Sequence, residues 1–257
     1  MQLNVSYDFQ AKQPSCRAAV VMDHFGVGFE TGPHVISSGL ELPIHPGDVV
    51  CFTGASGSGK YSLMRTAAQV LADEDHQTVV NLDELDLGDQ ILIEALELPV
   101  SEAMGILAAC GLSEARLLLR TPRELSDGQR YRFRLALAVS KKPDWVVADE
   151  FSATLDRTLA KVVAFNLRRL ADRTGIGFLL ATTHEDIISD LAPSLHVVCR
   201  LDGQIDCLRS GEESDAETAR KKNGGSVSST TFTSPPDRHA IGHTSLGGIT
   251  GVITSAS

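Results

Sequence analysis

The stretch GASGSGKYS, residues 54–62, decides the fold because its glycines and lysine have the spacing of a loop that wraps around phosphate groups. Gly54, Gly57 and Gly59 let consecutive backbone N–H groups curl around phosphate oxygens with no Cβ in the way. Lys60 would supply a fixed positive charge to the β- and γ-phosphates. The stretch therefore predicts a nucleotide-phosphate site.

The segments on either side of this loop have the secondary structure that a phosphate-binding loop needs, a strand before it and a helix after it. The apolar run 48–54 suits a buried strand, and the spacing of apolar residues over 61–72 predicts a helix. The positive end of that helix would face the same anion. Three loop serines belong to the same predicted phosphate site: Ser56, Ser58 and Ser62.

Tyr61 departs from the usual pattern, in which the lysine is followed by a serine or threonine whose hydroxyl binds Mg²⁺. A tyrosine carries its hydroxyl a full ring farther from the backbone. We predict a site that binds the phosphates of a nucleotide but depends less on Mg²⁺ and turns over slowly. The alternative is that Tyr61 is tolerated with no kinetic effect.

Composition limits the function classes. The formal net charge of −10 argues against a broad electrostatic surface for nucleic acid or anionic membrane. No apolar run has the length of a membrane span, and the first ten residues lack the pattern of a secretory signal. Five scattered cysteines, none in CxxC spacing, indicate reduced thiols. We expect a cytoplasmic protein with no direct membrane insertion.

Strand and helix patterns alternate over residues 1–209, which predicts an α/β domain with a mostly parallel sheet flanked by helices. Further strands are predicted at 78–83, 145–149 and 177–184, and a hairpin at 196–209 around Asp202-Gly203. A helix is predicted over 156–175, with an Asp near its start and a Gly at its end.

Three segments lie outside this alternation. Residues 91–120 contain no good strand and predict a helical insertion between two strands of the sheet. Residues 18–30 and 34–44 are expected to be strands of an N-terminal antiparallel side sheet. The Ser-, Thr- and Gly-rich stretch 210–257 predicts a disordered tail.

Asp149 and Glu150 form an acidic pair directly after the predicted strand 145–149. Ligands of parallel sheets bind at the carboxyl ends of the strands. Asp149 would hold Mg²⁺, directly or through water. Glu150 would orient and deprotonate the attacking water.

The segment LSDGQRYRFRLALA, residues 125–138, resembles the signature segment of ATP-binding cassette (ABC) ATPases, usually written LSGGQ. Ser126, Gly128 and Gln129 match that pattern, whereas Asp127 replaces the family's first glycine. The resemblance implies that this segment contacts the γ-phosphate bound by another subunit's loop. A serine hydroxyl, an unobstructed N–H and a helix N-terminus suit that contact.

Other family landmarks follow in order. FSATLD, residues 151–156, resembles the loop after the catalytic glutamate and ends at Asp156. ATTHED, residues 181–186, resembles the switch-histidine segment, which implies that His184 bonds the γ-phosphate and steadies the water. Gln90 is a candidate for the glutamine that senses Mg²⁺ at the start of the helical insertion. Phe25 and Phe29 are candidates for stacking on adenine, or for core roles.

The resemblance implies a P-loop ATPase that binds and hydrolyses ATP with Mg²⁺ as a head-to-tail homodimer. One chain has one phosphate loop and one signature, so each composite site needs a second copy. Ser126 lies only 36 positions after Gln90, counting 126 − 90, and this short insertion favours a soluble, non-transport role. The alternatives are the ATP-binding subunit of a transporter with a separate membrane chain, and an ATP sensor with little hydrolysis. The sequence names no client or cargo.

Overall fold

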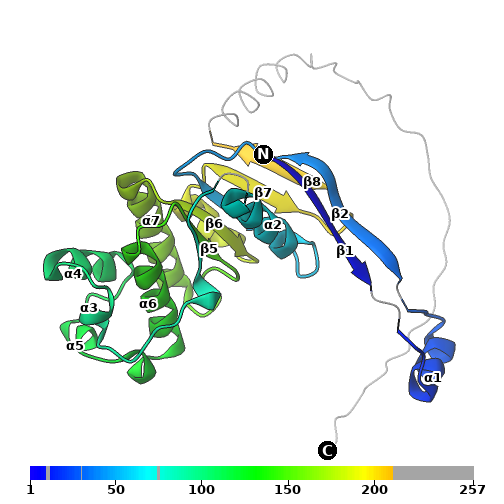
Figure 1. The fold of residues 1–257 in the computed structure, drawn as a ribbon, viewed down its shortest axis with the longest axis horizontal. Helices are drawn as coiled ribbons and strands as arrows, with labels where there is room; N and C mark the ends of the chain where they lie inside the picture. Colours follow the sequence, from blue (N-terminus) through cyan, green and yellow to red (C-terminus); the bar gives the residue numbers. More distant parts are fainter. Residues whose placement is uncertain (10–11, 30, 74–75, 211–257) are drawn as a thin grey trace, which may run out of the picture. The chain divides into compact units, whose positions relative to one another are not determined.

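The computed structural model describes residues 1–9, 12–29, 31–73 and 76–210 (Figure 1). Its main element is a six-stranded sheet in which β8 is antiparallel to β7 and the other neighbouring pairs are parallel. The strands lie in the order β4 (Val79–Asn81), β5 (Trp145–Ala148), β6 (Gly177–Thr182), β3 (Val49–Thr53), β7 (Leu195–Cys199) and β8 (Ile205–Arg209). The predicted α/β class and its mostly parallel sheet are confirmed.

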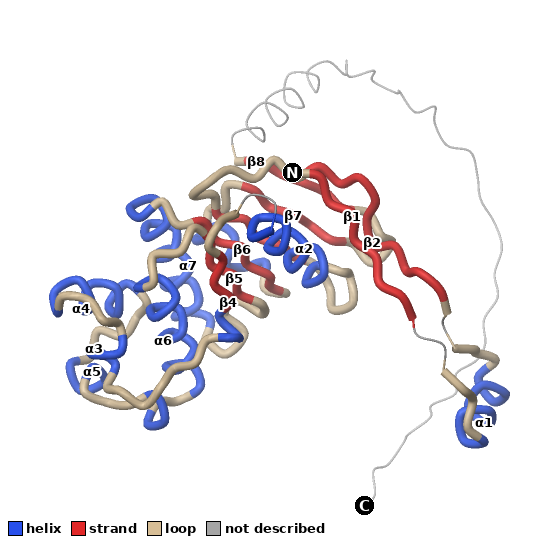
Figure 2. The backbone as a smooth tube through the Cα atoms, in the orientation of Figure 1, coloured by secondary structure: helices blue, strands red, loops and turns tan. Residues whose placement is uncertain are grey.

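Helices cover both faces of the sheet because its central strands are apolar on both faces. Every residue of β3, β5 and β6 is buried. On one face lies α2 (Lys60–Asp73), as Figure 2 shows for the backbone. Its Leu63, Met64 and Ala67 belong to a buried cluster with Val50 and Phe52 of β3.

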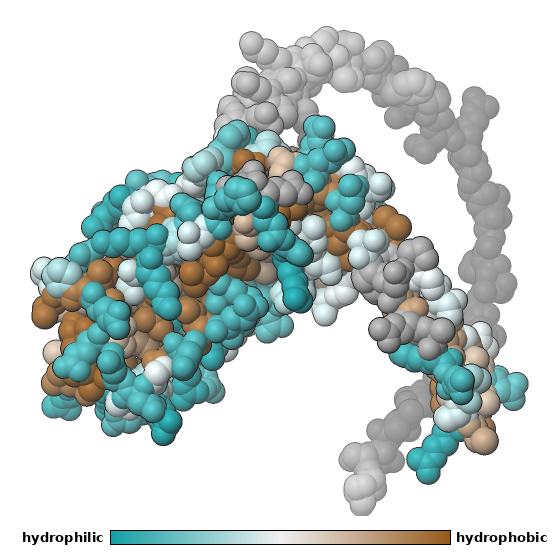
Figure 3. Space-filling view, viewed as in Figure 1, coloured by the Kyte–Doolittle hydropathy of each residue, from teal (hydrophilic) through white to brown (hydrophobic). Residues whose placement is uncertain are grey.

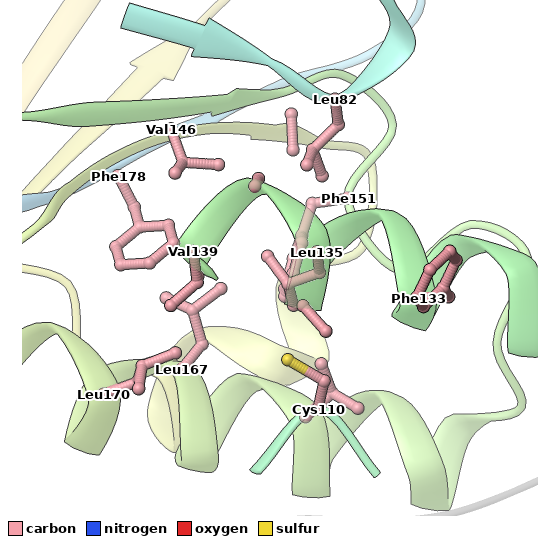
Figure 4. Packing of buried hydrophobic residues seen from close by; sticks show 14 of the residues in the cluster. Leu82, Cys110, Phe133, Leu135, Val139, Val146, Phe151, Leu167, Leu170 and Phe178 are labelled. Carbon is pink, nitrogen blue, oxygen red and sulfur yellow. The ribbon is translucent and has the colours of Figure 1, made fainter. Parts of the chain in front are cut away.

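On the other face lie α6 (Asp127–Ser140) and α7 (Arg157–Thr174). Figure 4 shows Leu135 and Val139 of α6 beside Leu167 of α7, under Val146 and Phe178 of the sheet. This cluster also takes in buried residues of the helical insertion. The same buried cluster therefore contains residues of α6, which begins within the signature segment, and of β5, the strand that precedes Asp149 and Glu150.

The caps of α7 follow from its sequence. Asp156 is the N-cap, and its carboxylate accepts a hydrogen bond from the Leu159 N–H at 2.9 Å. Gly175 ends the helix in the left-handed conformation, with φ 72°. The prediction of a helix over 156–175 is confirmed.

The helical character of residues 91–120 is also confirmed. The insertion consists of α3 (Leu92–Ala95), α4 (Val100–Ala109) and α5 (Ala115–Leu118). Shorter helical turns join the main elements: η1 (Leu82–Glu84), η2 (Pro122–Glu124), η3 (Glu185–Ile187) and α8 (Ile188–Leu191). None of the helices in the described ranges has the length and apolar character to cross a membrane.

The N-terminal side sheet pairs β1 (Gln2–Phe9) with β2 (Gly32–Glu41) in antiparallel register. The predicted strand over 18–30 is wrong, because α1 (Cys16–Phe25) occupies most of that segment. Two valines within the run favoured a strand, yet the Ser15 side chain caps the helix start and Gly26 ends it with φ 64°. No residue of α1 is buried, so the caps at its two ends, and not the burial of apolar side chains, account for its helical structure.

The predicted tail, 210–257, lies outside the described residues from 211 onward. The division of the chain into a domain of residues 1–209 and a tail therefore stays a prediction.

Candidate nucleotide site

A cavity of about 780 Å³ lies at the carboxyl ends of the parallel strands. The loop after β3, the residues after β5 and β6, strand β2 and the β7–β8 turn all contribute to it. The lining residues are Val35, Ile36, Ser56, Gly57, Ser58, Gly59, Lys60, Tyr61, Ser62, Asp149, Glu150, Thr183, Arg200, Leu201, Asp202 and Gly203. The structure thus brings most of the predicted loop and the acidic pair together.

Two positions of the loop require glycine, because neighbouring atoms lie too close to leave room for a Cβ. Gly54 has φ 144°, and a Cβ there would collide with the Cys199 carbonyl oxygen. Gly59 has φ 84°, and a Cβ there would lie 2.7 Å from Cγ2 of Ile36. The Lys60 Nζ donates a hydrogen bond across the loop to the Ala55 carbonyl oxygen at 3.3 Å.

This geometry fits phosphate groups. The loop residues 56–60 line the cavity and lead directly into the start of α2, where the helix dipole is positive. The hydroxyl of Ser58 is buried and has no hydrogen-bond partner within the described part of the chain. A buried hydroxyl of this kind is stabilised by an added acceptor such as a phosphate oxygen.

The acidic pair is held by its own backbone. The N–H of Glu150 donates to Oδ1 of Asp149 at 2.8 Å, and Glu150 adopts φ 47°. A positive φ at a non-glycine residue is strained, and such strain is common at functional sites. Asp149 is half-buried and Glu150 is exposed, and both line the cavity. The two residues thus differ in solvent exposure.

Tyr61 borders two hollows. Besides the main cavity it lines a smaller one of about 290 Å³, where α2 faces β4 and β5, and Asp149 lines both. Tyr61 as a whole residue is 43% exposed. A divalent cation that Asp149 held would therefore have a phenol ring beside it, where related loops place a short hydroxyl.

The structure does not bring Gln90 into the main cavity. Gln90 is exposed and lines a separate hollow with Asp86, Leu96 and Lys141. Its position in the sequence, at the start of the insertion, did not determine where the chain after β4 would place it.

Sequence reasoning missed residues at and after the end of β4 that lie near Asp149 in the smaller hollow. Asn81 ends β4, which pairs in parallel with β5, and Asn81 and Glu84 line the smaller hollow with Asp149. Burial raises the pKa of Asp83, the charge of Asp149 raises it further, and Arg134 opposes the rise. Part of the signal was present in the sequence, because acidic residues closely follow the strand that Asn81 ends, whereas the pairing of this strand with β5 comes from the fold.

His184 follows β6 and lies next to Thr183, which lines the cavity. The backbone N–H of His184 donates to Oγ1 of Thr182 at 3.0 Å. The Thr182 hydroxyl in turn donates to the Phe151 carbonyl oxygen at 3.1 Å. The segments after β5 and β6 are thereby held together.

The residues of the signature segment lie outside the lining of the main cavity. Ser126 is the N-cap of α6, and its hydroxyl accepts from the Gln129 N–H, while the Gln129 side chain accepts from the Ser126 N–H at 3.1 Å. A Cβ at Gly128 would lie 3.2 Å from the Thr154 carbonyl oxygen. Ser126, Gly128, Gln129 and Asp156 do not line the cavity of their own chain within its described lining.

The rest of the cavity lining is part aliphatic and part charged. Val35, Ile36 and Leu201 line the cavity together with Arg200 and Asp202. Among the described residues that line the cavity, Tyr61 is the sole aromatic one. The candidate stacking residues Phe25 and Phe29 are not part of this lining.

A glycine-rich loop between a buried strand and a helix, with an acidic pair at the end of a parallel strand, defines a P-loop nucleotide-binding protein. No family model matches the chain. Similar proteins and solved structures nevertheless identify the class more closely.

The aliphatic sulfonates import ATP-binding protein SsuB 2 of Mesorhizobium japonicum is 33% identical over 183 residues, which cover 65% of this chain and 73% of that protein. The cytochrome c biogenesis ATP-binding export protein CcmA of Cupriavidus necator is 30% identical and is 76% covered. The lipoprotein-releasing system ATP-binding protein LolD of Pseudomonas syringae is 27% identical over 226 residues, which cover 74% of this chain and 97% of that protein.

Among solved structures, the dimeric ATP-binding cassette MJ0796 with ADP and Pi has a TM-score of 0.58 at 18% identity, covering 81% of this chain and 98% of that chain. CbiO1 of Clostridium perfringens has a TM-score of 0.55 at 19% identity, and the match covers 74% of this chain and 87% of the CbiO1 chain. These likenesses show the same fold. The chain belongs to the family of ABC ATP-binding proteins and is an ATP hydrolase.

Proposed function

We propose that this chain is the ATP-hydrolysing subunit of a transporter whose membrane part is a separate chain. The similar proteins named above are an import, an export and a lipoprotein-release subunit, and this favours transport over the non-transport role expected from the sequence. Their cargoes differ, so we propose no cargo class. ATP is supplied in the cytoplasm, and we place the chain at the cytoplasmic face of a membrane.

The observation that carries this proposal is the apolar surface of the helical insertion. Val100 is 64% exposed, Met104 47% and Leu119 70%. Figure 3 shows hydrophobic surface gathered over α3, α4 and α5. Exposed apolar side chains that gather in one place indicate a surface that another chain covers. We propose that the membrane chain docks here.

Lys60 and the loop N–H groups would bind the phosphates of ATP, and Asp149 would hold Mg²⁺. Mg²⁺, when bound, neutralises charge that develops on the phosphates. Glu150 would accept a proton from the attacking water, and His184 would donate a hydrogen bond to the terminal phosphate. Gln90 has no role in this scheme, because it lies in another hollow.

We propose that a second copy completes the site. Ser126 and Gly128 lie at the N-terminus of α6, whose dipole favours an anion, yet they do not line the cavity of their own chain. A twofold head-to-tail dimer would place this N-terminus over the partner's phosphate loop in both sites.

The test of the transport role places a photo-cross-linking amino acid at Met104 and, as a control, at Val162 of α7. The two side chains are 47% and 48% exposed, so they offer equal access. In membranes of the source cells we expect Met104, and not Val162, to cross-link to a chain with several membrane spans. Equal labelling at both positions, or none at Met104, would overturn the proposal.

A second candidate is a non-transport ATPase, which the shortness of the insertion favours. α3 and α5 have four residues each, so little helical surface is available for docking. Recovery of the whole protein without membranes, together with a cross-link from Met104 to a partner that lacks membrane spans, would support this candidate instead.

A further inference from the structure

Arg157, the first residue of α7, contacts two residues that follow β6. Its Nη2 lies 3.1 Å from Nδ1 of His184, and its Nη1 lies 3.1 Å from Oδ1 of Asp186. One guanidinium therefore joins the start of α7, directly after Asp156, to the histidine expected to contact the terminal phosphate.

The chemistry of the two groups fixes the direction of the hydrogen bond. A guanidinium has N–H donors and no acceptor, so Nδ1 of His184 must accept. A ring nitrogen that accepts carries no proton, and the neutral imidazole then carries its proton on Nε2. We propose that Arg157 is a positioning residue that holds His184 in the Nε2–H form. His184 then offers a donor, rather than a lone pair, to an anionic ligand.

Asp186 makes this arrangement more than a chance surface contact. It pairs with the Nη1 side of Arg157, while the Nη2 side faces the histidine, so the guanidinium is held by two groups at once. The backbone of His184 is fixed separately through Thr182, which is buried. Backbone and ring are thus restrained from different elements, and a restrained donor loses less entropy when it binds its ligand.

The catalytic value of this arrangement rests on the proposed role of His184. The tautomer itself does not, because it depends only on the contact between Arg157 and His184. Two separate measurements therefore test the two statements.

The first measurement is nitrogen NMR of the full chain with ¹⁵N-labelled histidine rings. The signals of His184 are assigned by their loss in His184→Gln. We expect Nδ1 without a proton and Nε2 with one in the native chain. Arg157→Ala should shift the ring from the Nε2–H form alone toward the mixture of neutral tautomers that a free imidazole shows, and Arg157→Lys, which keeps a donor, should retain much of the native preference. An unchanged tautomer in Arg157→Ala would overturn the inference.

The second measurement is the steady-state ATPase rate. Arg157→Ala should lower kcat on the order of tenfold with KM nearly unchanged, because a positioned proton donor acts in the transition state. Arg157→Lys should recover part of the loss. Arg169→Ala removes an exposed arginine of the same helix and should change neither quantity. An equal loss in Arg169→Ala would show a general effect on α7 and contradict the inference.

Asp186→Asn supplies a second variant if Arg157→Ala does not fold. It leaves Arg157 in place without its ionic partner, and we expect a smaller shift of the tautomer and of kcat in the same direction. No shift of either would contradict the inference. If the native chain shows the Nε2–H form but His184→Gln hydrolyses ATP normally, the proposed role of His184 fails while the role of Arg157 stands.

Discussion

At the scale of single residues, Tyr61 is the main departure from the phosphate-loop pattern. Its identity was evident from the sequence, but its surroundings were not. The structure shows that the ring shares the edge of the cavity with Asp149 and also lines the hollow between α2 and the sheet. The ring therefore has room beside the loop, and phosphate binding by the backbone N–H groups does not require its removal.

Replacing this tyrosine tests its effect on the metal. Tyr61→Ser should raise kcat roughly tenfold, the scale of about 1.4 kcal/mol in the barrier, and should tighten the apparent Mg²⁺ requirement. The physical reason is that a short hydroxyl at this position can reach the ion. ATP affinity without metal should change little. Steady-state ATPase assays over a Mg²⁺ titration measure both effects.

Tyr61→Phe is the matched control, because it keeps the ring and removes only the hydroxyl. We expect it to behave as the native chain does. If Tyr61→Ser also left kcat and the Mg²⁺ titration unchanged, Tyr61 would have no bearing on the metal.

At the scale of elements, the sequence predicted the helices and strands that are long, periodic or buried. The run before the phosphate loop became β3, and the segment 91–120 became helical as expected. The prediction failed where capping residues favour a helix and β-branched residues favour a strand. The α1 segment contains adjacent valines but has a capped start and a left-handed glycine at its end, and the caps decided its structure.

The candidate site was predictable where residues lie close to the end of a strand and was not predictable where a long irregular stretch carries them. Asp149 directly follows β5, and Lys60 begins α2 after the short loop that follows β3, so the sheet brings the two residues into one cavity. Gln90 follows a longer irregular stretch after η1, and the path of such a stretch depends on tertiary packing. The role of Arg157 could not be predicted from the sequence, because its contacts with His184 and Asp186 form only when the fold brings α7 and the segment after β6 together.

Asp156 illustrates two roles in one residue, because it caps α7 and belongs to the predicted composite site. Asp156→Ala should lower the free energy of unfolding by about 1 kcal/mol, since the Leu159 N–H loses its acceptor. Asp156→Asn keeps an acceptor and should leave the stability near the native value. Urea denaturation measures both changes.

The ATPase rates of the same two variants separate the roles. If the carboxylate charge acts in the site, Asp156→Asn should lower kcat while its stability stays native. A native rate in Asp156→Asn, together with the stability loss in Asp156→Ala, would leave capping as the function of this residue.

At the scale of the whole molecule, residues 1–210 contain the sheet, its covering helices and the cavity. Removing residues 211–257 should leave Tm and the ATPase rate nearly unchanged, because the composition of that segment does not favour a packed core. Calorimetry of the shortened chain tests this expectation. A Tm change above about 4 °C would show that the segment stabilises the domain.

The composite dimer is the claim that joins the cavity to the signature helix, and Glu150→Gln tests it most directly. This change removes the proposed base but keeps the size of the side chain, so hydrolysis should stop with ATP still bound. Light scattering at saturating Mg-ATP should then give the mass of two chains, and ADP should return it to one. A single-chain mass at saturating Mg-ATP, with ATP binding confirmed by calorimetry, would contradict the composite site.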